Sequence, residues 1–256
     1  MKLTVLGTGT VAPSARRAAP AYWVEAGPVR LLLDCGAGTL LRATAHGVPW
    51  HAVTHIALTH FHIDHWGELP HFLFALKHGT EPARSAGLDL LGPNGLRARL
   101  EALAEGYGAW VLGEDLGYPL RIREVAPGAG IDLGGGVTLE ACKTPHTDES
   151  LAYAVRHREV RLVYTGDTGP SAALAEWARG CDLLVAECSL PADRAIPLHL
   201  TPEQAGTLAQ AAGARRLVLT HFYPPVEAVD PAEVAAGVFD GDVVAAADGD
   251  VFTIEA

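Results

Sequence analysis

The chain alternates short apolar runs with amphipathic segments, and this order predicts an α/β protein. Apolar runs bounded by turn-forming residues are typical of buried strands, whereas apolar residues spaced three or four apart are typical of helices. In the first half we expect strands at 2–6, 22–25, 29–33, 55–59 and 88–93, and helices at 38–46, 65–79 and 95–105. In the second half we expect strands at 131–133, 137–142, 150–156, 160–165, 182–187 and 217–220, a strand pair within 242–256, and helices at 171–179 and from Thr201 onward. The stretch 106–119, with aromatics among glycines, is expected to be a loop or lid.

The four letters LTHF occur twice, at 58–61 and at 219–222. Each copy ends an apolar run, so each predicts a buried strand that delivers a histidine at its C-terminal end. Each half also has a strand ending near an aspartate, Asp34 or Asp167, followed by a helix. We therefore expect a single domain, 1–256, built from two pseudo-repeated halves of about 1–130 and 131–256, whose LTHF ends meet at one edge.

Composition narrows the classes of protein that the chain can belong to. With 49% hydrophobic and 19% charged residues, its 256 residues can bury a full core. No apolar stretch approaches the roughly 20 residues that span a bilayer. The N-terminus is a poor signal peptide, and the four cysteines form no CxxC pair, which together favour a cytoplasmic protein with reduced thiols. The net charge of −11 argues against general nucleic-acid binding, which requires clustered Lys and Arg.

The segment HFHIDH places four potential metal ligands within six residues, just after a predicted strand: His60, His62, Asp64 and His65. Neutral imidazole and carboxylate are ligands that zinc and related divalent ions accept. One helix could not direct all four side chains to one point, but a loop can. A polar turn with ordinary histidines is the alternative, and the density of the cluster favours a metal site.

HFHIDH resembles the HxHxDH motif of the metallo-β-lactamase superfamily. Four further segments resemble motifs of that family: LLLDCGAGT with Asp34, TPHTDES with His146, YTGDTG with Asp167, and the second LTHF with His221. Taken alone, His146 and Asp167 would be interpreted as turn residues. The resemblance implies an αββα sandwich, in which two mixed β-sheets carry helices on their outer faces.

The same resemblance implies two divalent metal ions, with zinc expected and manganese or iron as alternatives. His60, His62 and His146 would bind one ion, Asp64, His65 and His221 the other, and Asp167 would bridge both. Asp34 would support the ligand loop. Two ions about 3.5–4 Å apart can supply a bound hydroxide near neutral pH and neutralise charge that develops on the substrate.

Asp167 separates the chain from many β-lactamases, which carry cysteine at this position or use no bridging ligand, so phosphodiester, thioester and lactone hydrolysis are the candidate reactions. Three segments resemble the ribonuclease Z branch: LGTGTVAPSARRAAPAYWVE, CDLLVAECSL with Glu187, and PLHLTPEQAGTLAQAAGARRLVLTHF with His199. In that branch the histidine contacts the phosphate and can donate a proton to the leaving oxygen. A carboxylate behind an imidazole fixes its tautomer and stabilises its protonated form. Alternatively, His199 caps the following helix and Glu187 is an ordinary carboxylate.

The chain departs from ribonuclease Z in one respect. That family carries a long basic arm between the motifs of His146 and Asp167, and here only 20 residues intervene. We therefore expect a phosphodiesterase acting on a small or short single-stranded phosphodiester, with Asp64, His199 and Glu187 as the catalytic residues.

Several alternatives stay open: tRNA 3′ processing, a lactonase or thioesterase, and a noncatalytic metal-stabilised interaction module. A redox di-iron centre is disfavoured, because redox members of the superfamily carry Glu where this chain has His62. Trp66, Trp110 and Tyr118 are either cleft-lining or core residues, and a homodimer is compatible with the branch.

Overall fold

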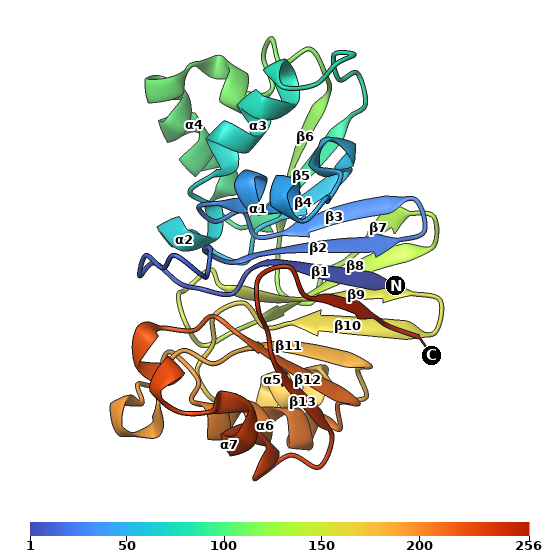
Figure 1. Ribbon diagram of the computed structural model, residues 1–256. Helices are drawn as coiled ribbons and strands as arrows, with labels where there is room; N and C mark the ends of the chain where they lie inside the picture. Colours follow the sequence, from blue (N-terminus) through green and yellow to red (C-terminus); the bar gives the residue numbers. More distant parts are fainter. Residues whose placement is uncertain (256) are drawn as a thin grey trace.

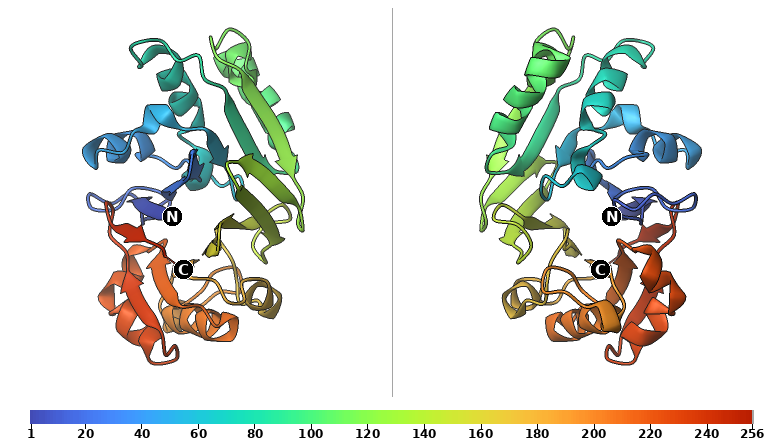
Figure 2. Two further views of the ribbon diagram at one scale, coloured as in Figure 1. Left: turned by 90° about the vertical axis from the view of Figure 1, so that its right-hand side faces the viewer. Right: turned by 90° about the vertical axis from the view of Figure 1, so that its left-hand side faces the viewer.

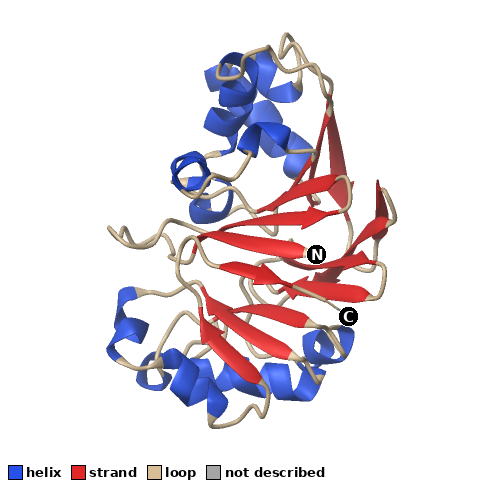
Figure 3. Cartoon of the chain, turned by 45° about the vertical axis from the view of Figure 1, so that its right-hand side comes forward, coloured by secondary structure: helices blue, strands red, loops and turns tan. Residues whose placement is uncertain are grey.

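The computed structural model describes residues 1–255 and has four layers, helices, sheet, sheet and helices (Figures 1 and 3). Two seven-stranded sheets face each other, and the helices cover their outer faces. The expected αββα sandwich is therefore confirmed. No helix formed by residues 1–255 is long and apolar enough to cross a membrane.

The first sheet has the strand order β14-β1-β2-β3-β4-β5-β6. Its strands are β1 (Lys2–Gly7), β2 (Ala21–Ala26), β3 (Val29–Leu33), β4 (His55–Ala57), β5 (Leu88–Pro93), β6 (Leu120–Val125) and β14 (Val251–Thr253). The helices of this half are α1 (Thr39–Ala45), α2 (Ile63–Trp66), α3 (Leu69–His78) and α4 (Leu96–Tyr107), with short 3-10 helices at Trp50–Ala52 and Ala109–Leu112.

The second sheet has the order β13-β12-β11-β10-β9-β8-β7. Its strands are β7 (Gly130–Gly134), β8 (Val137–Lys143), β9 (Leu151–His157), β10 (Val160–Tyr164), β11 (Leu183–Glu187), β12 (Arg216–Thr220) and β13 (Asp242–Ala245). The helices of this half are α5 (Ala172–Trp177), α6 (Pro202–Ala212) and α7 (Pro231–Ala236), with 3-10 helices at Ala192–Arg194 and Pro224–Ala228. As expected, α6 is capped by Thr201, whose hydroxyl accepts from the N–H of Gln204.

Both sheets use the same pairing pattern. An antiparallel meander, β1-β2-β3 or β7-β8-β9-β10, leads into parallel strands, β3-β4-β5-β6 or β10-β11-β12-β13. By this pattern β4 corresponds to β11, and β12 corresponds to β5. The two LTHF segments follow β4 and β12, so they end non-equivalent strands. The interpretation of His60 and His221 as corresponding positions of a duplication is therefore wrong.

The core consists of three hydrophobic clusters, one between the sheets and one under each helical layer. Side chains on successive residues of β3 point to opposite faces of the sheet, so this one strand contributes to two of the clusters. Leu31 and Leu33 point into the cluster between the sheets, and Leu32 points into the cluster under α1, α3 and α4. Because both faces are covered, the strand is a continuous apolar run, as is typical of buried strands in α/β proteins.

Some elements differ from the sequence expectation. The strand β6 was not predicted, because Arg121, Arg123 and Glu124 interrupt its apolar pattern at the sheet edge. The predicted helix 65–79 is two helices, since the chain turns at Gly67 and Glu68 before Pro70 opens the first turn of α3. The short helix α7 was missed as well.

The strands predicted as a pair within 242–256 do not pair with each other. β13 pairs with β12, whereas β14 pairs with β1 and completes the first sheet. In Figure 2 the red C-terminal strand accordingly lies against the blue N-terminal strand. The last strand thus crosses from the second half of the chain to the first sheet.

The three aromatics considered for a cleft, Trp66, Trp110 and Tyr118, all pack in the cluster under the helices of the first half. The Tyr118 hydroxyl donates to the carbonyl of Leu73 in α3. All four cysteines are free thiols, and three are buried while Cys142 is half-buried.

The region between His146 and Asp167 holds little more than a hairpin. β9 and β10 are joined by the two residues Arg158 and Glu159, with His157 paired to Val160. Arg158 has a positive φ of 57°, as tight hairpin turns require. The place at which ribonuclease Z is expected to carry an arm is therefore a tight turn.

The central cluster predicts a difference between two leucine truncations. Leu31→Ala should lower the free energy of unfolding by about 2–5 kcal/mol, because Leu31 is fully buried between the sheets. The same change at Leu41, which is 72% exposed, should cost less than about 0.5 kcal/mol. Urea denaturation of both variants measures the difference, and equal midpoints would contradict this description of the core.

Candidate metal centre

The candidate ligands and their supports follow the C-terminal ends of parallel strands. Asp34 follows β3, His60 follows β4, Asp167 follows β10 and His221 follows β12, while Glu187 ends β11. The carboxyl ends of parallel strands lie at one edge of a sheet, and here the two sheets bring their edges together. The other ligand candidates lie in the adjoining segments, His62, Asp64 and His65 around the start of α2 and His146 between β8 and β9.

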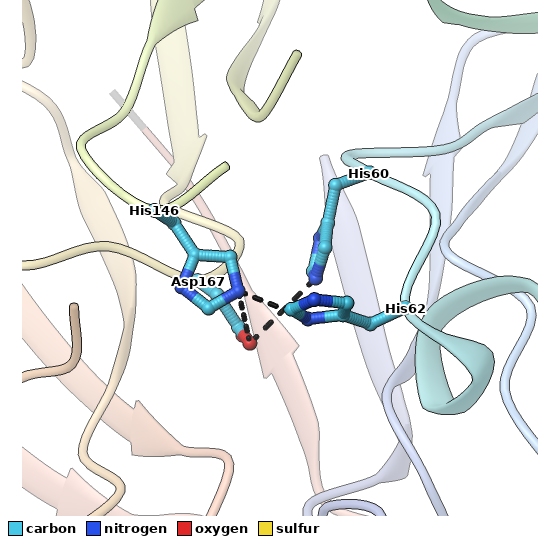
Figure 4. Close-up of side chains that lie close together, drawn as sticks. All are labelled: His60, His62, His146 and Asp167. Carbon is cyan, nitrogen blue, oxygen red and sulfur yellow. Dashed lines mark hydrogen bonds and ion pairs between the residues drawn. The ribbon is translucent and has the colours of Figure 1, made fainter. Parts of the chain in front are cut away.

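Figure 4 shows the first group of converging side chains, His60, His62, His146 and Asp167. Their ligand atoms all lie within 4.8 Å of one another. The Nε2 atoms of His146 and His60 lie 3.5 Å and 3.8 Å from Oδ2 of Asp167. Nε2 of His146 also lies 3.0 Å from Nδ1 of His62. Side chains 107 positions apart in sequence thus present their donor atoms to one small volume.

The second group consists of Asp64, His65 and His221. Nε2 of His65 lies 3.3 Å from Nε2 of His221, which is itself 3.5 Å from Oδ2 of Asp64. Oδ1 of Asp167 lies 3.2 Å and 3.4 Å from those two ring nitrogens. The Asp167 carboxylate therefore lies between the groups, with Oδ2 toward the first and Oδ1 toward the second.

Two buried polar atoms of this cluster have no hydrogen-bond partner, Nε2 of His60 and Oδ1 of Asp167. Leaving buried polar atoms unpaired is costly, and a cation held by each of the two groups would satisfy these atoms, His60 in the first group and Oδ1 of Asp167 beside the second. Burial lowers the pKa of His60 well below its usual value, which favours the neutral form that binds metals. Burial alone would raise the pKa of Asp167, but the facing His221 and His65 rings outweigh it and hold the pKa well below the usual range. The residues present therefore fit a metal site.

The outer nitrogens of four rings are held by hydrogen-bond partners that fix the tautomer. Nδ1 of His146 lies 3.0 Å from the Leu198 carbonyl oxygen, and Nδ1 of His65 lies 2.8 Å from Oδ2 of Asp34. Both oxygens can only accept, so each Nδ1 carries a proton and Nε2 is the ring nitrogen left for an ion. Such partners orient the ligands of metal sites and raise their basicity.

His60 and His221 are held in the same way through hydroxyl groups. The Thr59 hydroxyl donates to Asp34 and therefore accepts from Nδ1 of His60, at 3.0 Å. The Ser189 hydroxyl donates to Oε2 of Glu187 and accepts from Nδ1 of His221, at 2.8 Å. All four rings consequently have Nδ1 engaged and Nε2 left as the nitrogen that can bind an ion.

Asp34 is the support that the sequence indicated, although only one backbone N–H, that of Thr59, donates to it, at 2.7 Å. The hydroxyls of Thr59 and Tyr164 and the ring of His65 make its other contacts, at 2.7–3.0 Å. The carboxylate is completely buried, so these contacts compensate for its lost hydration.

Glu187 and His199 form the pair that the sequence indicated. Oε1 of Glu187 accepts from Nδ1 of His199 at 2.8 Å, and the glutamate is 1% exposed. Burial lowers the pKa of His199, but the hydrogen bond and charge of Glu187 outweigh it, so the pKa is raised from its ordinary value. The ring stacks on His221 at 5.8 Å between centroids, which places it beside the cluster.

A third combination, Asp167, His199 and His221, also brings ligand atoms within 4.8 Å. The His199 atom closest to Asp167 is Nδ1, at 4.0 Å, and this atom is already hydrogen-bonded to Glu187. Nδ1 of His199 is therefore not free to bind a metal in this third combination.

Two functional supports were missed from the sequence, Ser189 and Tyr164. Ser189 joins Glu187 to His221, and the Tyr164 hydroxyl donates to Asp34 from the opposite sheet. The only sequence signal was their position, two residues after Glu187 and three before Asp167, because Ser and Tyr are common in strands and turns.

Comparisons with known proteins agree with the fold and the cluster. A family model described as "Beta-lactamase superfamily domain" matches residues 29–222. Ribonuclease Z from Mycobacterium sp. (strain KMS) is 32% identical over 250 residues, covering 88% of this chain and 85% of that protein. The metallo-beta-lactamase fold protein YhfI from Bacillus subtilis superposes with a TM-score of 0.83 at 26% identity over 98% of both chains. Human tRNase Z, short form, superposes with a TM-score of 0.81 at 25% identity over 100% of both chains.

These matches show that the chain belongs to the beta-lactamase superfamily, as a metal-dependent hydrolase of ester bonds. Within the superfamily it is ribonuclease Z-like.

The cluster predicts that metal binding and stability are coupled. Removal of divalent ions with a chelator should lower the Tm by about 5–10 °C. A free ion concentration of about 100 times the Kd stabilises the folded protein by about 2.7 kcal/mol, and the chelator removes this contribution. Differential scanning calorimetry before and after re-addition of zinc measures this shift. In Asp167→Ala, which removes the carboxylate that faces both groups, the Tm should no longer respond to zinc. A wild-type Tm that ignores both treatments would show that the cluster binds no ion.

Proposed function

We propose that the protein is a dinuclear metal-dependent phosphodiesterase that hydrolyses a small or short single-stranded phosphodiester. The observation that carries this proposal is the buried Glu187–His199 pair beside the His/Asp cluster. A cluster that only bound metal would not need an imidazole whose pKa is raised and whose Nδ1 is fixed by a carboxylate. That arrangement suits proton donation to a leaving oxygen.

The seven candidate ligands take separate roles in this proposal. His60, His62 and His146 would hold one ion, Asp64, His65 and His221 would hold the other, and the Asp167 carboxylate faces both groups. Zinc suits this set of imidazoles and carboxylates, and manganese or iron are alternatives. Bound ions would polarise a water molecule and neutralise charge that develops on the phosphate oxygens.

His199 supplies the proton in this scheme. Its Nδ1 is used by Glu187, so Nε2 is the nitrogen that can face the substrate. A protonated imidazole donates this proton to the oxygen that leaves phosphorus, and Glu187 stabilises the charged ring beforehand. Ser189 holds Glu187 by a 2.6 Å hydrogen bond, and the backbone N–H groups of Thr168 and Leu200 also donate to this carboxylate.

Processing of tRNA is the second candidate function, because the similar mycobacterial protein is a ribonuclease Z. We rank it lower because the net charge is −11 and a two-residue turn stands where the branch is expected to carry its basic arm. Lactone or thioester hydrolysis at the same centre is a further alternative. The free thiols support a reducing compartment, and we propose the cytoplasm.

A comparison of leaving groups tests the role of His199. His199→Ala should lower kcat by about 10²-fold or more on a dinucleotide, whose alkoxide leaving group needs a proton. The loss on bis(4-nitrophenyl) phosphate should be less than about tenfold, because nitrophenolate leaves without one. Steady-state kinetics with metal-loaded protein measures both, and metal content should stay unchanged.

His157→Ala serves as the matched control, since His157 ends β9 outside the cluster. Glu187→Gln combined with His199→Ala should cost no more than His199→Ala alone, because the glutamate acts through the histidine. An equal loss of kcat on both substrates would contradict a proton-donating role. Hydrolysis of lactones or thioesters with no activity on either phosphodiester would overturn the proposed reaction.

Metal counting tests the two-ion assignment. The wild-type chain should bind about two zinc ions, and His221→Ala about one, because His221 belongs to the second group of candidate ligands and not to the first. Inductively coupled plasma mass spectrometry on zinc-dialysed protein gives the ratio. His71→Ala, at an exposed histidine of α3, should keep both ions. One ion in the wild type would leave a mononuclear centre.

A further inference from the structure

A groove lies between the loop that joins β1 to β2, the helix α1 and the start of α2. Its volume is about 600 Å³, within the roughly 300–1,000 Å³ of small-molecule sites. In Figure 1 this loop, in dark blue, extends toward α2 beside the first sheet. We call it the aliphatic groove, and we define it by Val11, Ala12, Pro13, Leu41, Ile63 and Asp64.

The groove exposes large aliphatic side chains that residues 1–255 leave uncovered. Leu41 is 72% exposed, Ile63 is 66% exposed and Val11 is 55% exposed. Contiguous exposed apolar surface of this kind commonly marks a binding site, whereas single exposed apolar residues need no explanation. These three side chains come from three different segments of the chain and line one groove.

The groove is continuous with the candidate metal centre. Asp64 lines the groove and also belongs to the second ligand group with His65 and His221. Ile63 lies between His62 and Asp64 in the ligand loop itself. A molecule whose ester lies at the ligand cluster can therefore extend directly into the groove.

The chemistry of the lining selects a neutral, aliphatic occupant. The two arginines of the lining are already paired, Arg17 with Glu227 at 2.6 Å and Arg42 with Asp248 at 3.2 Å. Both positive charges are thus largely neutralised by carboxylates of the protein, so they do not favour binding of an anion in the groove. The lining contains no aromatic side chain on which a nucleic-acid base could stack.

We propose that the aliphatic groove binds an alkyl substituent of the substrate while the ester lies at the ligand cluster. The inference rests on the proposed phosphodiesterase function and narrows its substrates to small phosphodiesters that carry an aliphatic chain. Contacts in the groove are the same before and during reaction, so they lower KM and raise kcat/KM without being needed for the chemistry.

The test uses methyl, butyl and octyl 4-nitrophenyl phosphate with the zinc-loaded chain, below the micellar concentration of the octyl ester. Each is cleaved by water to 4-nitrophenol and the alkyl phosphate. For the wild type, kcat/KM should rise about two- to fourfold per methylene until the groove is filled. Leu41→Asp should abolish this rise and leave turnover of the methyl ester unchanged, because the side chain is exposed and lies outside the ligand cluster.

Two control variants separate the groove from a general effect of charge or shape. Val251→Asp places the same charge on an exposed residue of β14, remote from the groove lining, and should keep the dependence on chain length. Leu41→Met keeps an apolar side chain of similar volume and should also keep it.

Two results would overturn the inference, and a third separates it from the proposed function. Hydrolysis of all three esters with equal kcat/KM would reject the groove and leave the phosphodiesterase proposal intact. If no ester is hydrolysed, the proposed function fails. Calorimetry then compares the Kd of the octyl ester with that of the methyl ester, and equal values would show that the groove does not bind the alkyl chain. If light scattering shows a dimer that Leu41→Asp dissociates, and chain length has no effect, the groove is an interface between copies of this chain.

Discussion

The buried carboxylate of Asp34 is the interaction on which the candidate site depends. It lies at the end of β3 in the left-handed region, at φ 57°, and is completely buried. Its partners come from both sheets, because Thr59 and His65 belong to the first half and Tyr164 to the second. One charged group therefore fixes the loop after β4, the tautomer of a ligand histidine and the distance between the sheets. Burial makes each of these contacts obligatory, since an unpaired carboxylate here would be very costly.

Buried tyrosines extend this connection between the sheets. The Tyr22 hydroxyl, from β2, lies 2.7 Å from Thr220 at the end of β12, and Tyr153, from β9, donates to the Leu58 carbonyl before His60. Each hydrogen bond joins a strand of one sheet to a residue one or two positions before a candidate ligand histidine of the other. Apolar burial is not directional, whereas these hydrogen bonds each require one relative position of the two sheets. The ligand groups of the two halves are thereby aligned before any ion binds.

Much of the site could be predicted from the sequence, because its signals are local and chemically dense. HFHIDH needs only six residues to indicate a metal, and His146, Asp167 and His221 follow from resemblance. The features that the sequence did not predict depend on tertiary contacts. Ser189 gains its role only when Glu187 and His221 lie side by side, and β6 is recognisable as a strand only by its pairing with β5. The LTHF repeat was misleading, since strands in different positions of their sheets can end in the same four residues when both must deliver a histidine.

The hairpin turn at Arg158 and Glu159 lies at the end of β10 opposite the ligand cluster. Five strand residues separate it from the segment that carries Asp167, a distance of roughly 17 Å. Any segment inserted at this turn would begin far from the His/Asp cluster. It would contact only a bound molecule long enough to extend from the cluster along β10. A substrate short enough to fit at the cluster would never meet it. Under the proposed function, the length of this loop therefore bears on substrate size and leaves the chemistry at the cluster unchanged.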